Sequence, residues 1–399
     1  MILELEQMTI KFPDNFLWGT STAAAQIETA SDHNWKNFKS RDGYTFLRTS
    51  DHEKRRDEDL EYIRQFGSIY RCGVDWARLQ PAPMADFEQD VVKEYQDFFQ
   101  KLLDADMRIM FVFHHFCNPM WFENNGTWLN LENIPAFMDF AKKCMKHFGD
   151  YAYIFNTFNE PGVYALNGFM IGNFPPQKRG YFKGNRVLAH MGEAHDELYD
   201  LLKAKYPEKQ VGISKNTGTF FGTNWLGKWV AKKFDWWFHD KSSSYFEKND
   251  FWGISYYVYM PFNPYPISEV DYPGKLKKMG IPNDKMWGYH PKGLKNILLR
   301  YHKKYNKPII ITENGVCTDD DEFRQQSLKD YLHTCHEAMQ EGVDLRGYIH
   351  WTTIDNFDWN LGPTYRFGLV HVDFDTMNRT MTGAGKFYKK ITEENAVTL

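Results

Sequence analysis

Two glutamates in this sequence stand directly after short apolar runs that are typical of buried strands. Residues 153–158 lead to Asn159 and Glu160, and Pro161 then prevents simple continuation of the strand. Residues 308–312 lead in the same way to Glu313. In a parallel β/α barrel every strand delivers its C-terminal end to the same rim, so the two carboxyl groups would share one pocket and be available for acid–base chemistry.

Further polar and aromatic side chains follow the other predicted strands. Carboxylates and amides hydrogen-bond hydroxyl groups, and indole rings stack on the apolar face of a sugar, so this mixture favours a neutral polyhydroxylated ligand. Side chains alternate along a strand, so only one residue of each adjacent pair below needs to face the pocket. The candidates are Gln26, Arg71, the pair His114 and His115, Asn159, Glu160, the pair Tyr256 and Tyr257, Glu313, Trp351, Asp355, Asn356, Asp358 and Trp359.

Each candidate also has a purely structural interpretation. A single glutamate at a strand end is usually a solvated loop residue or a salt-bridge partner, and three residues of Asn-Glu-Pro are a weak motif. Arg71 would serve to balance buried acids, and Trp351 would serve to fill a barrel. The functional hypothesis therefore rests on the whole set falling at one end of one fold.

The elements that would position these residues alternate regularly between strand and helix. Such alternation predicts parallel strands with right-handed crossovers, and eight units in this length predict an α/β fold consisting of a single (β/α)8 TIM barrel over residues 1–399. Residues 217–249 have a mixed aromatic pattern that we do not assign, and a long loop is expected up to about residue 291. The predicted strands are residues 16–21, 68–76, 108–113, 153–159, 210–214, 251–257, 308–312 and 346–351, and the predicted helices are 56–66, 89–103, 134–148, 186–205, 294–304 and 321–340.

Composition narrows the classes of partner. The 399 residues are 42% hydrophobic and carry a formal charge of −4, which gives no reason to expect nucleic acid or an anionic membrane as a partner. We expect no signal peptide and no membrane-spanning segment. Five cysteines without CxxC spacing are typical of reduced thiols, so a cytoplasmic location is expected. The sequence shows no regularly spaced metal-ligand set and implies no cofactor.

At this point the chain resembles the family 1 glycoside hydrolases, the retaining β-glucosidase family, over residues 12–388. The resemblance lies in motifs whose order and spacing agree with the family as well as their letters. Segments 157–161 (TFNEP) and 311–315 (ITENG) are similar to the acid/base and nucleophile motifs. Further similar segments are 16–28, 70–81, His115 with Pro119, Trp351, 355–359 and 366–369.

The resemblance implies specific roles for these residues. Glu313 would be the nucleophile and Glu160 the acid/base catalyst, with Arg71 and Tyr257 favouring the anionic form of Glu313. Asn159 would hold the 2-hydroxyl of the sugar. The outer hydroxyls would be held by Gln26, His115, Asp358 and Trp359, above Trp351 as a stacking floor.

Three residues depart from the family pattern. Phe116 stands where tryptophan is usual, Ser255 where asparagine is usual, and Asp358 where glutamate is usual. Asp358 is one methylene shorter than the residue that typically grips the 4- and 6-hydroxyls, so glucose, galactose, fucose, mannose and xylose all stay open. A 6-phosphorylated sugar is disfavoured by the resemblance: phospho-specific members of the family place a Ser/Lys phosphate-binding set in the loop after the eighth strand, and residues 358–366 contain neither Ser nor Lys.

The expected activity is hydrolysis of a terminal non-reducing β-linked sugar, an exo-β-glycosidase reaction with net retention. One alternative is a transglycosidase, in which an acceptor sugar reacts faster than water. Another is a non-catalytic carbohydrate-binding barrel, although the presence of both carboxyl groups argues against it. A metal-dependent barrel is a third alternative, which undiminished activity in chelator would exclude. The oligomeric state, aglycone and pH optimum stay open.

Overall fold

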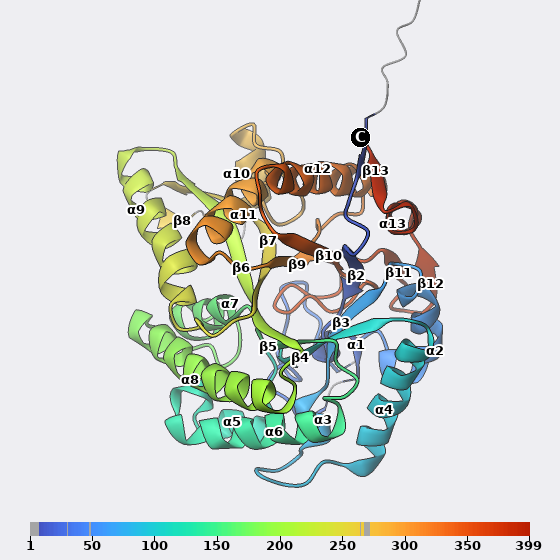
Figure 1. Ribbon diagram of the computed structural model, residues 1–399. Helices are drawn as coiled ribbons and strands as arrows, with labels where there is room; N and C mark the ends of the chain where they lie inside the picture. Colours follow the sequence, from blue (N-terminus) through green and yellow to red (C-terminus); the bar gives the residue numbers. More distant parts are fainter. Residues whose placement is uncertain (1–7, 30, 48, 264, 267–271) are drawn as a thin grey trace, which may run out of the picture.

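The computed structural model describes residues 8–29, 31–47, 49–263, 265–266 and 272–399. Within them, eight parallel strands close into a barrel with helices packed around it, which confirms the predicted fold class (Figure 1). Neighbouring strands follow chain order, and pairing between the last barrel strand and the first completes the circle. The strands are β2 (Leu17–Ser21), β3 (Ile69–Gly73), β4 (Arg108–His114), β5 (Ile154–Asn159), β6 (Gln210–Gly222), β7 (Phe251–Asn263), β9 (Ile309–Asn314) and β10 (Leu345–Trp351).

The helices turn an apolar face toward the barrel. In α4 (Gln89–Asp104), for example, Val92, Tyr95, Phe99 and Leu102 recur at helical spacing and are buried. The other long helices are α2 (His52–Ile63), α6 (Ile134–His147), α8 (Tyr181–Lys205), α11 (Pro291–Tyr305), α12 (Asp321–Gln340) and α13 (Gly383–Glu394). Shorter elements are α1 (Ala24–Ile27), α3 (Trp76–Leu79), α5 (Met120–Asn124), α7 (Pro161–Ala165), α9 (Trp225–Asp235), α10 (Tyr272–Lys278) and the π-helical segments η3 (Leu166–Ile171) and η4 (Trp236–Lys241).

Three short antiparallel pairings lie outside the barrel. β1 (Thr9–Lys11) pairs with β13 (Ala396–Thr398), and β11 (Val370–Val372) pairs with β12 (Arg379–Met381). β8 (Tyr265–Pro266) pairs with the end of β7. Among the described residues, no helix is long and apolar enough to cross a bilayer.

The barrel interior has an apolar layer of its own. Seven buried side chains from seven of the strands form a cluster separate from the main core: Leu17, Ile69, Met110, Ile154, Phe251, Ile310 and Ile349. The larger core packs the helices onto the outside of the strands. Polar side chains occupy the C-terminal end of the interior, as is typical of this architecture.

Several elements differ from the sequence prediction. β6 and β7 run well beyond residues 214 and 257, because they continue to pair with each other as far as Gly222 and Phe262. The predicted strand over 68–76 ends at Gly73, since Asp75 accepts a hydrogen bond from Arg78 N and starts α3. α9, α10 and α13 occupy regions where no helix was predicted.

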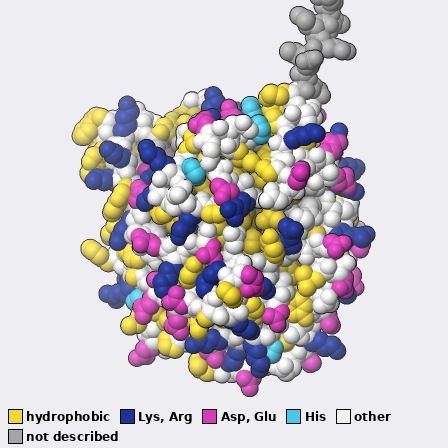
Figure 2. Space-filling model, in the orientation of Figure 1, with side chains coloured by type: hydrophobic (Ala, Val, Ile, Leu, Met, Phe, Trp, Pro, Cys, Tyr) yellow, Lys and Arg dark blue, Asp and Glu magenta, His cyan; other side chains and the backbone are white. Residues whose placement is uncertain are grey.

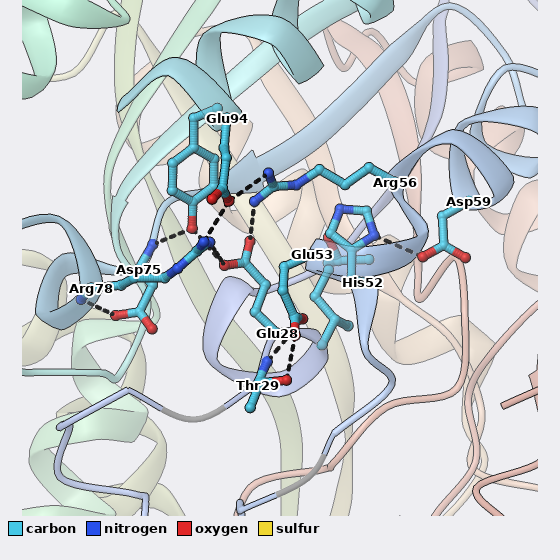
Figure 3. Close-up of polar contacts among 12 residues, drawn as sticks. Glu28, Thr29, His52, Glu53, Arg56, Asp59, Asp75, Arg78 and Glu94 are labelled. Atoms are coloured by element: carbon cyan, nitrogen blue, oxygen red, sulfur yellow. Dashed lines mark hydrogen bonds and ion pairs between the residues drawn. The ribbon is translucent and has the colours of Figure 1, made fainter. Parts of the chain in front are cut away.

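A buried network of charges fixes the loop that follows β2 (Figure 3). Glu28 lies 3.6 Å from both Arg56 and Arg78, and it accepts a hydrogen bond of 2.6 Å from the Tyr95 hydroxyl. Glu94 pairs with both arginines. Burial raises the pKa of Glu28, and the two arginines oppose that rise. The network therefore ties α1, which carries Gln26, to α2, α3 and α4.

Candidate active site

Strand register gathers the candidate residues at one end of the barrel. Across β10, β2 and β3, Trp351 is opposite Ser21, and Ser21 is opposite Arg71. Asn159 on β5 is opposite Ser214 on β6, after a register shift that begins at Asn156. On β7, a similar shift precedes the pairing of Ser255 with Glu313 on β9. Such irregularities re-aim side chains and are common beside active sites.

Arg71 links side chains from four other strands. Its Nη1 donates to Ser21 Oγ at 3.0 Å and to Glu313 Oε1 at 2.8 Å. Its Nη2 donates to Asn159 Oδ1 at 2.6 Å and to Ser214 Oγ at 3.0 Å. The guanidinium is fully buried, so these partners compensate for its desolvation and hold it in one orientation.

Glu313 is a buried carboxylate with two fixed donors. Arg71 binds one oxygen, and the Tyr257 hydroxyl donates to the other at 3.1 Å. Burial raises the pKa of Glu313, while the charge of Arg71 and the hydrogen bond from Tyr257 oppose that rise. The ion pair with Arg71 and the hydrogen bond from Tyr257 both favour the anionic form of Glu313.

Glu160 leaves the strand in a left-handed conformation, with φ 41° and ψ 55°. Its backbone N–H donates to Ser214 O at 2.8 Å, and Pro161 then begins α7. This turn projects the Glu160 side chain at the mouth of β5. Burial, followed by the negative charge of Glu313, raises the pKa of Glu160 to about 8. The two carboxyl groups therefore differ: Glu313 is bound by a guanidinium and a hydroxyl donor, whereas the pKa of Glu160 is raised to about 8.

Asn159 and His115 form a chain of fixed hydrogen bonds. The Asn159 oxygen accepts from Arg71, so its amide nitrogen is the group that donates to His115 Nε2 at 2.7 Å. The His115 proton consequently lies on Nδ1, which is buried and has no partner among the described residues. Burial and the charge of Arg71 lower the pKa of His115, so the ring is neutral and has a donor available for a ligand hydroxyl.

Gln26, on α1, and Asp358, in the loop after β10, lie near one another. Gln26 Nε2 donates to Phe357 O at 2.9 Å and to Asn356 Oδ1 at 3.2 Å, which leaves its buried Oε1 as an unused acceptor. The Asp358 carboxyl group is buried, and the negative charge of Glu313 adds to the effect of burial in raising its pKa to about 7. Both groups are suited to bind hydroxyls.

Aromatic rings form the wall of the site. The His115 ring lies 5.7 Å from that of Trp351 and 5.5 Å from that of Trp359. Trp359 also packs on Trp35 at 5.0 Å and on Phe116 at 5.1 Å. Phe116, which departs from the family pattern, thus supports Trp359 through ring packing.

In each of the two adjacent pairs, His114 with His115 and Tyr256 with Tyr257, the two side chains point to opposite sides of the strand, as predicted. His114 is directed into the core, where its Nε2 contacts Asn118 Oδ1 at 2.9 Å, while His115 faces Asn159. The Tyr256 hydroxyl donates to His290 O at 3.0 Å, outside the barrel. Tyr257 takes the inward position beside Glu313. The ten residues predicted for catalysis and substrate binding thus lie in one site.

Lys215 is a nearby charged residue that the sequence reasoning missed. It lies on β6 and is 1% exposed, with Nζ donating to Asn216 O at 2.6 Å and stacked over the Phe238 ring at 4.8 Å. Burial lowers the pKa of Lys215 to about 7, and the charge of Glu160 opposes that fall. Its only sequence signal is a lysine placed two residues after the apolar run of residues 211–213.

Sequence comparison identifies the family. Residues 8–222 and 237–397 match the sequence profile described as "Glycosyl hydrolase family 1". The chain belongs to this family. It is accordingly an O-glycosyl hydrolase, and the resemblance drawn from the sequence motifs is confirmed.

Relatives of this family 1 glycosyl hydrolase match it along nearly their whole length. "Beta-glucosidase A" of Acetivibrio thermocellus is 27% identical and matches over 97% of this chain and 99% of its own. "6-phospho-beta-galactosidase" of Clostridium acetobutylicum is 28% identical over 96% of this chain and 97% of its own. A solved structure of a Thermotoga maritima beta-glucosidase in complex with deoxynojirimycin superposes with a TM-score of 0.87 at 26% identity, covering 96% of this chain and 99% of that one.

Proposed function

We propose that the protein is a retaining exo-β-glycosidase that acts through a covalent glycosyl-enzyme. The observation that carries this proposal is the difference between its two buried carboxyl groups. Glu313 is held as an anion by Arg71 and Tyr257, whereas the pKa of Glu160 is raised to about 8. Retention requires one ionised nucleophile and one protonated acid about 5 Å apart.

In the first step, Glu313 attacks the anomeric carbon through an oxocarbenium-like transition state. Glu160 donates its proton to the glycosidic oxygen, so the aglycone leaves as a neutral alcohol. In the second step, Glu160 removes a proton from water, which attacks the same carbon and releases Glu313. Esterification of Glu313 removes the negative charge that raised the pKa of Glu160, so Glu160 becomes the better base when a base is needed.

We assign the substrate contacts to polar groups that keep a free hydrogen or lone pair, including the second hydrogen of the Asn159 amide, and to the aromatic residues beside them. Asn159 binds the 2-hydroxyl, a contact that strengthens in the transition state. His115 Nδ1 donates to an outer hydroxyl, and Gln26 Oε1 accepts from one. Trp351 supplies the stacking floor. Asp358 and Trp359 close the far side of the sugar, which favours action on a terminal residue.

The identity of the sugar depends most on Asp358. The relatives named above include a beta-glucosidase and a 6-phospho-beta-galactosidase. We favour an unphosphorylated sugar, because the loop of residues 358–366 carries a buried carboxyl group and neither Ser nor Lys. An anion at Asp358 would repel a phosphate placed near the 6-position.

We further propose that residues 1–399 act as one catalytic domain, that no cofactor takes part, and that the protein works in the cytoplasm. The free state of its cysteines supports that location: none of Cys72, Cys117, Cys144, Cys317 and Cys335 is in a disulfide.

Proton NMR of an aryl β-glycoside digest tests the proposal. The first-formed sugar should be the β-anomer, with the α-anomer appearing later by mutarotation. An α-anomer formed first would contradict retention. Added methanol distinguishes a hydrolase from a transglycosidase, because a transglycosidase would yield mainly the methyl β-glycoside. Sugar binding without turnover of any β-glycoside would support the non-catalytic barrel instead.

A further inference from the structure

The outward face of α9 and the first residue of η4 carry exposed tryptophans and lysines. Trp225, Trp229 and Trp236 are 80%, 57% and 50% exposed, unusually large values for this residue type. Lys228, Lys232 and Lys233 are exposed on the same helix. We call these six residues the Trp–Lys face. Figure 2 shows hydrophobic and basic side chains side by side at the upper left, where Figure 1 places α9.

Helix geometry arranges the Trp–Lys face as a central stripe with two flanks. Successive residues turn by about 100°, so positions 225, 229 and 236 fall within about 40° of one another. The buried Gly227 and Ala231 lie on the opposite side, against the barrel. Lys228 and Lys232 border the tryptophan stripe on one side, and Lys233 borders it on the other. The tryptophans therefore point directly away from the protein.

The charge of this surface is of one sign. None of its three lysines has an ion-pair partner among the residues that the structure describes, and no exposed acid lies on α9. Asp235, the acid of this helix, is half-buried and pairs with Arg300 at 2.9 Å. The formal net charge of the whole chain is −4, so the net charge does not reveal this local cationic face.

A second exposed segment extends the same character. Tyr181 and Phe182, at the start of α8, are 52% and 84% exposed, and Lys183 is exposed beside them. A hydrogen bond of 3.2 Å from Trp237 Nε1 to Asn185 Oδ1 joins this end of α8 to η4, which continues α9. Exposed aromatic and basic side chains thus occur on two elements that this hydrogen bond links.

The Trp–Lys face lies between the two parts of the chain that match the family profile. The match to the family profile stops at residue 222 and resumes at residue 237, so it omits the whole Trp–Lys face. α9 also begins three residues after the end of β6, at the end of the barrel that holds Glu160. The Trp–Lys face therefore lies on a segment that follows the C-terminal end of a barrel strand.

We propose that the Trp–Lys face docks the enzyme on the surface of an anionic lipid bilayer. Tryptophan is favoured at the boundary between headgroups and acyl chains, and flanking lysines extend to anionic headgroups. This proposal departs from the expectation, based on net charge alone, that no membrane is a partner. A symmetric contact between two copies is disfavoured, because it would set lysines against lysines. A glycan platform is disfavoured by the scarcity of carboxylate and amide acceptors on the face.

Co-sedimentation with lipid vesicles tests the proposal. The full-length enzyme should bind vesicles of phosphatidylcholine plus phosphatidylglycerol, bind pure phosphatidylcholine vesicles far less, and dissociate as salt is raised. Trp225→Ser and Lys232→Glu should each lower the partition coefficient, the charge reversal by roughly tenfold. Matched controls at other faces are Tyr153→Ser and Lys390→Glu, which should leave binding unchanged. All four variants should keep aryl-glycosidase activity, which shows that they fold.

Several results would overturn the proposal. One is the absence of binding to the anionic vesicles. Another is a decrease in the partition coefficient of the control variants that equals the decrease in Trp225→Ser and Lys232→Glu. The third is binding of equal strength to anionic and to neutral vesicles. Retention on polygalacturonate but not on vesicles would assign the face to an acidic glycan. Concentration-dependent dimerisation abolished by Trp225→Ser would assign it to a second copy.

Discussion

Arg71 Nη1 donates to Glu313 Oε1 across 2.8 Å, in a site where the arginine is wholly buried. Breaking a buried ion pair by removing one partner leaves an uncompensated charge, which costs about 3–5 kcal/mol. We therefore expect Arg71→Met to lower the free energy of unfolding by about that amount, as measured in denaturant. The exposed ion pair of Arg64 offers a control, since Arg64→Met should cost less than about 1 kcal/mol.

The same Arg71 variant should also change the pH profile. Loss of the positive charge raises the pKa of Glu313, and only the ionised form attacks. The acid limb of kcat/KM should therefore move to higher pH. A variant as stable and as active as the parent at low pH would contradict the assigned role of Arg71.

Protonation of Glu160 sets the basic limit of the reaction. Its pKa is about 8, and the acid must be protonated for the aglycone to leave. Activity should thus be present below pH 8 and fall as pH rises through that value, measured as kcat/KM on a substrate with a poor leaving group. In Glu160→Ala this limb should vanish, with turnover of such a substrate lowered by about 10²–10⁴-fold. An unchanged basic limb in that variant would assign the titration to another group.

Lys215 provides a way to shift that limit without touching substrate. Its positive charge favours ionisation of Glu160, so its removal should raise the pKa of Glu160. The pKa of Lys215 is about 7, so the lysine is only partly charged where the limb lies, and the basic limb of kcat/KM for Lys215→Met should move only slightly to higher pH, while KM changes little. Lys390→Met on α13 serves as the control for loss of a lysine. Movement of the limb to lower pH would show that the coupling has the opposite sign.

Asp358 should make sugar binding depend on pH in the opposite direction. Its pKa is about 7, and the ionised carboxylate is the stronger acceptor for sugar hydroxyls. For the preferred glycone, kcat/KM should therefore decrease as pH falls through 7, and Asp358→Asn should remove this dependence. Both effects are measured as kcat/KM at several pH values on a panel of nitrophenyl β-glycosides that differ only in the sugar. Asp358→Glu, which adds the usual methylene, should change the order of preference; an unaltered order would place specificity elsewhere.

Much of the fold could be predicted because the barrel strands are continuous apolar runs with clear ends. The prediction failed where burial does not follow the local pattern. The tryptophans of α9 point to solvent, so the apolar periodicity of this segment does not identify the helix face that packs on the barrel. α13 begins with Gly383-Ala384-Gly385, a weak helical start that is compensated by Thr382 capping the Gly385 N–H. β6 and β7 extend because they pair with each other, a long-range interaction that local sequence does not carry.

The site could be predicted to the extent that strand ends converge. Glu160, Glu313 and their partners were found from position and residue type, and the geometry brings them together. Lys215 was missed because a single lysine after a strand is normally solvated, and its burial depends on the packing of η4 over β6. Ser21 and Ser214 were missed because serine has no distinctive signal until Arg71 is placed between them.

Mass spectrometry of a trapped intermediate tests the central claim, that Glu313 forms the covalent bond to the sugar. A 2-deoxy-2-fluoro β-glycoside with an activated leaving group slows release of the glycosyl-enzyme more than its formation. We expect a mass increase of one fluoro-sugar per chain, located on the peptide that contains Glu313 and absent in Glu313→Gly. An adduct on any other residue, or turnover of ordinary substrate with retention by Glu313→Gly, would contradict it.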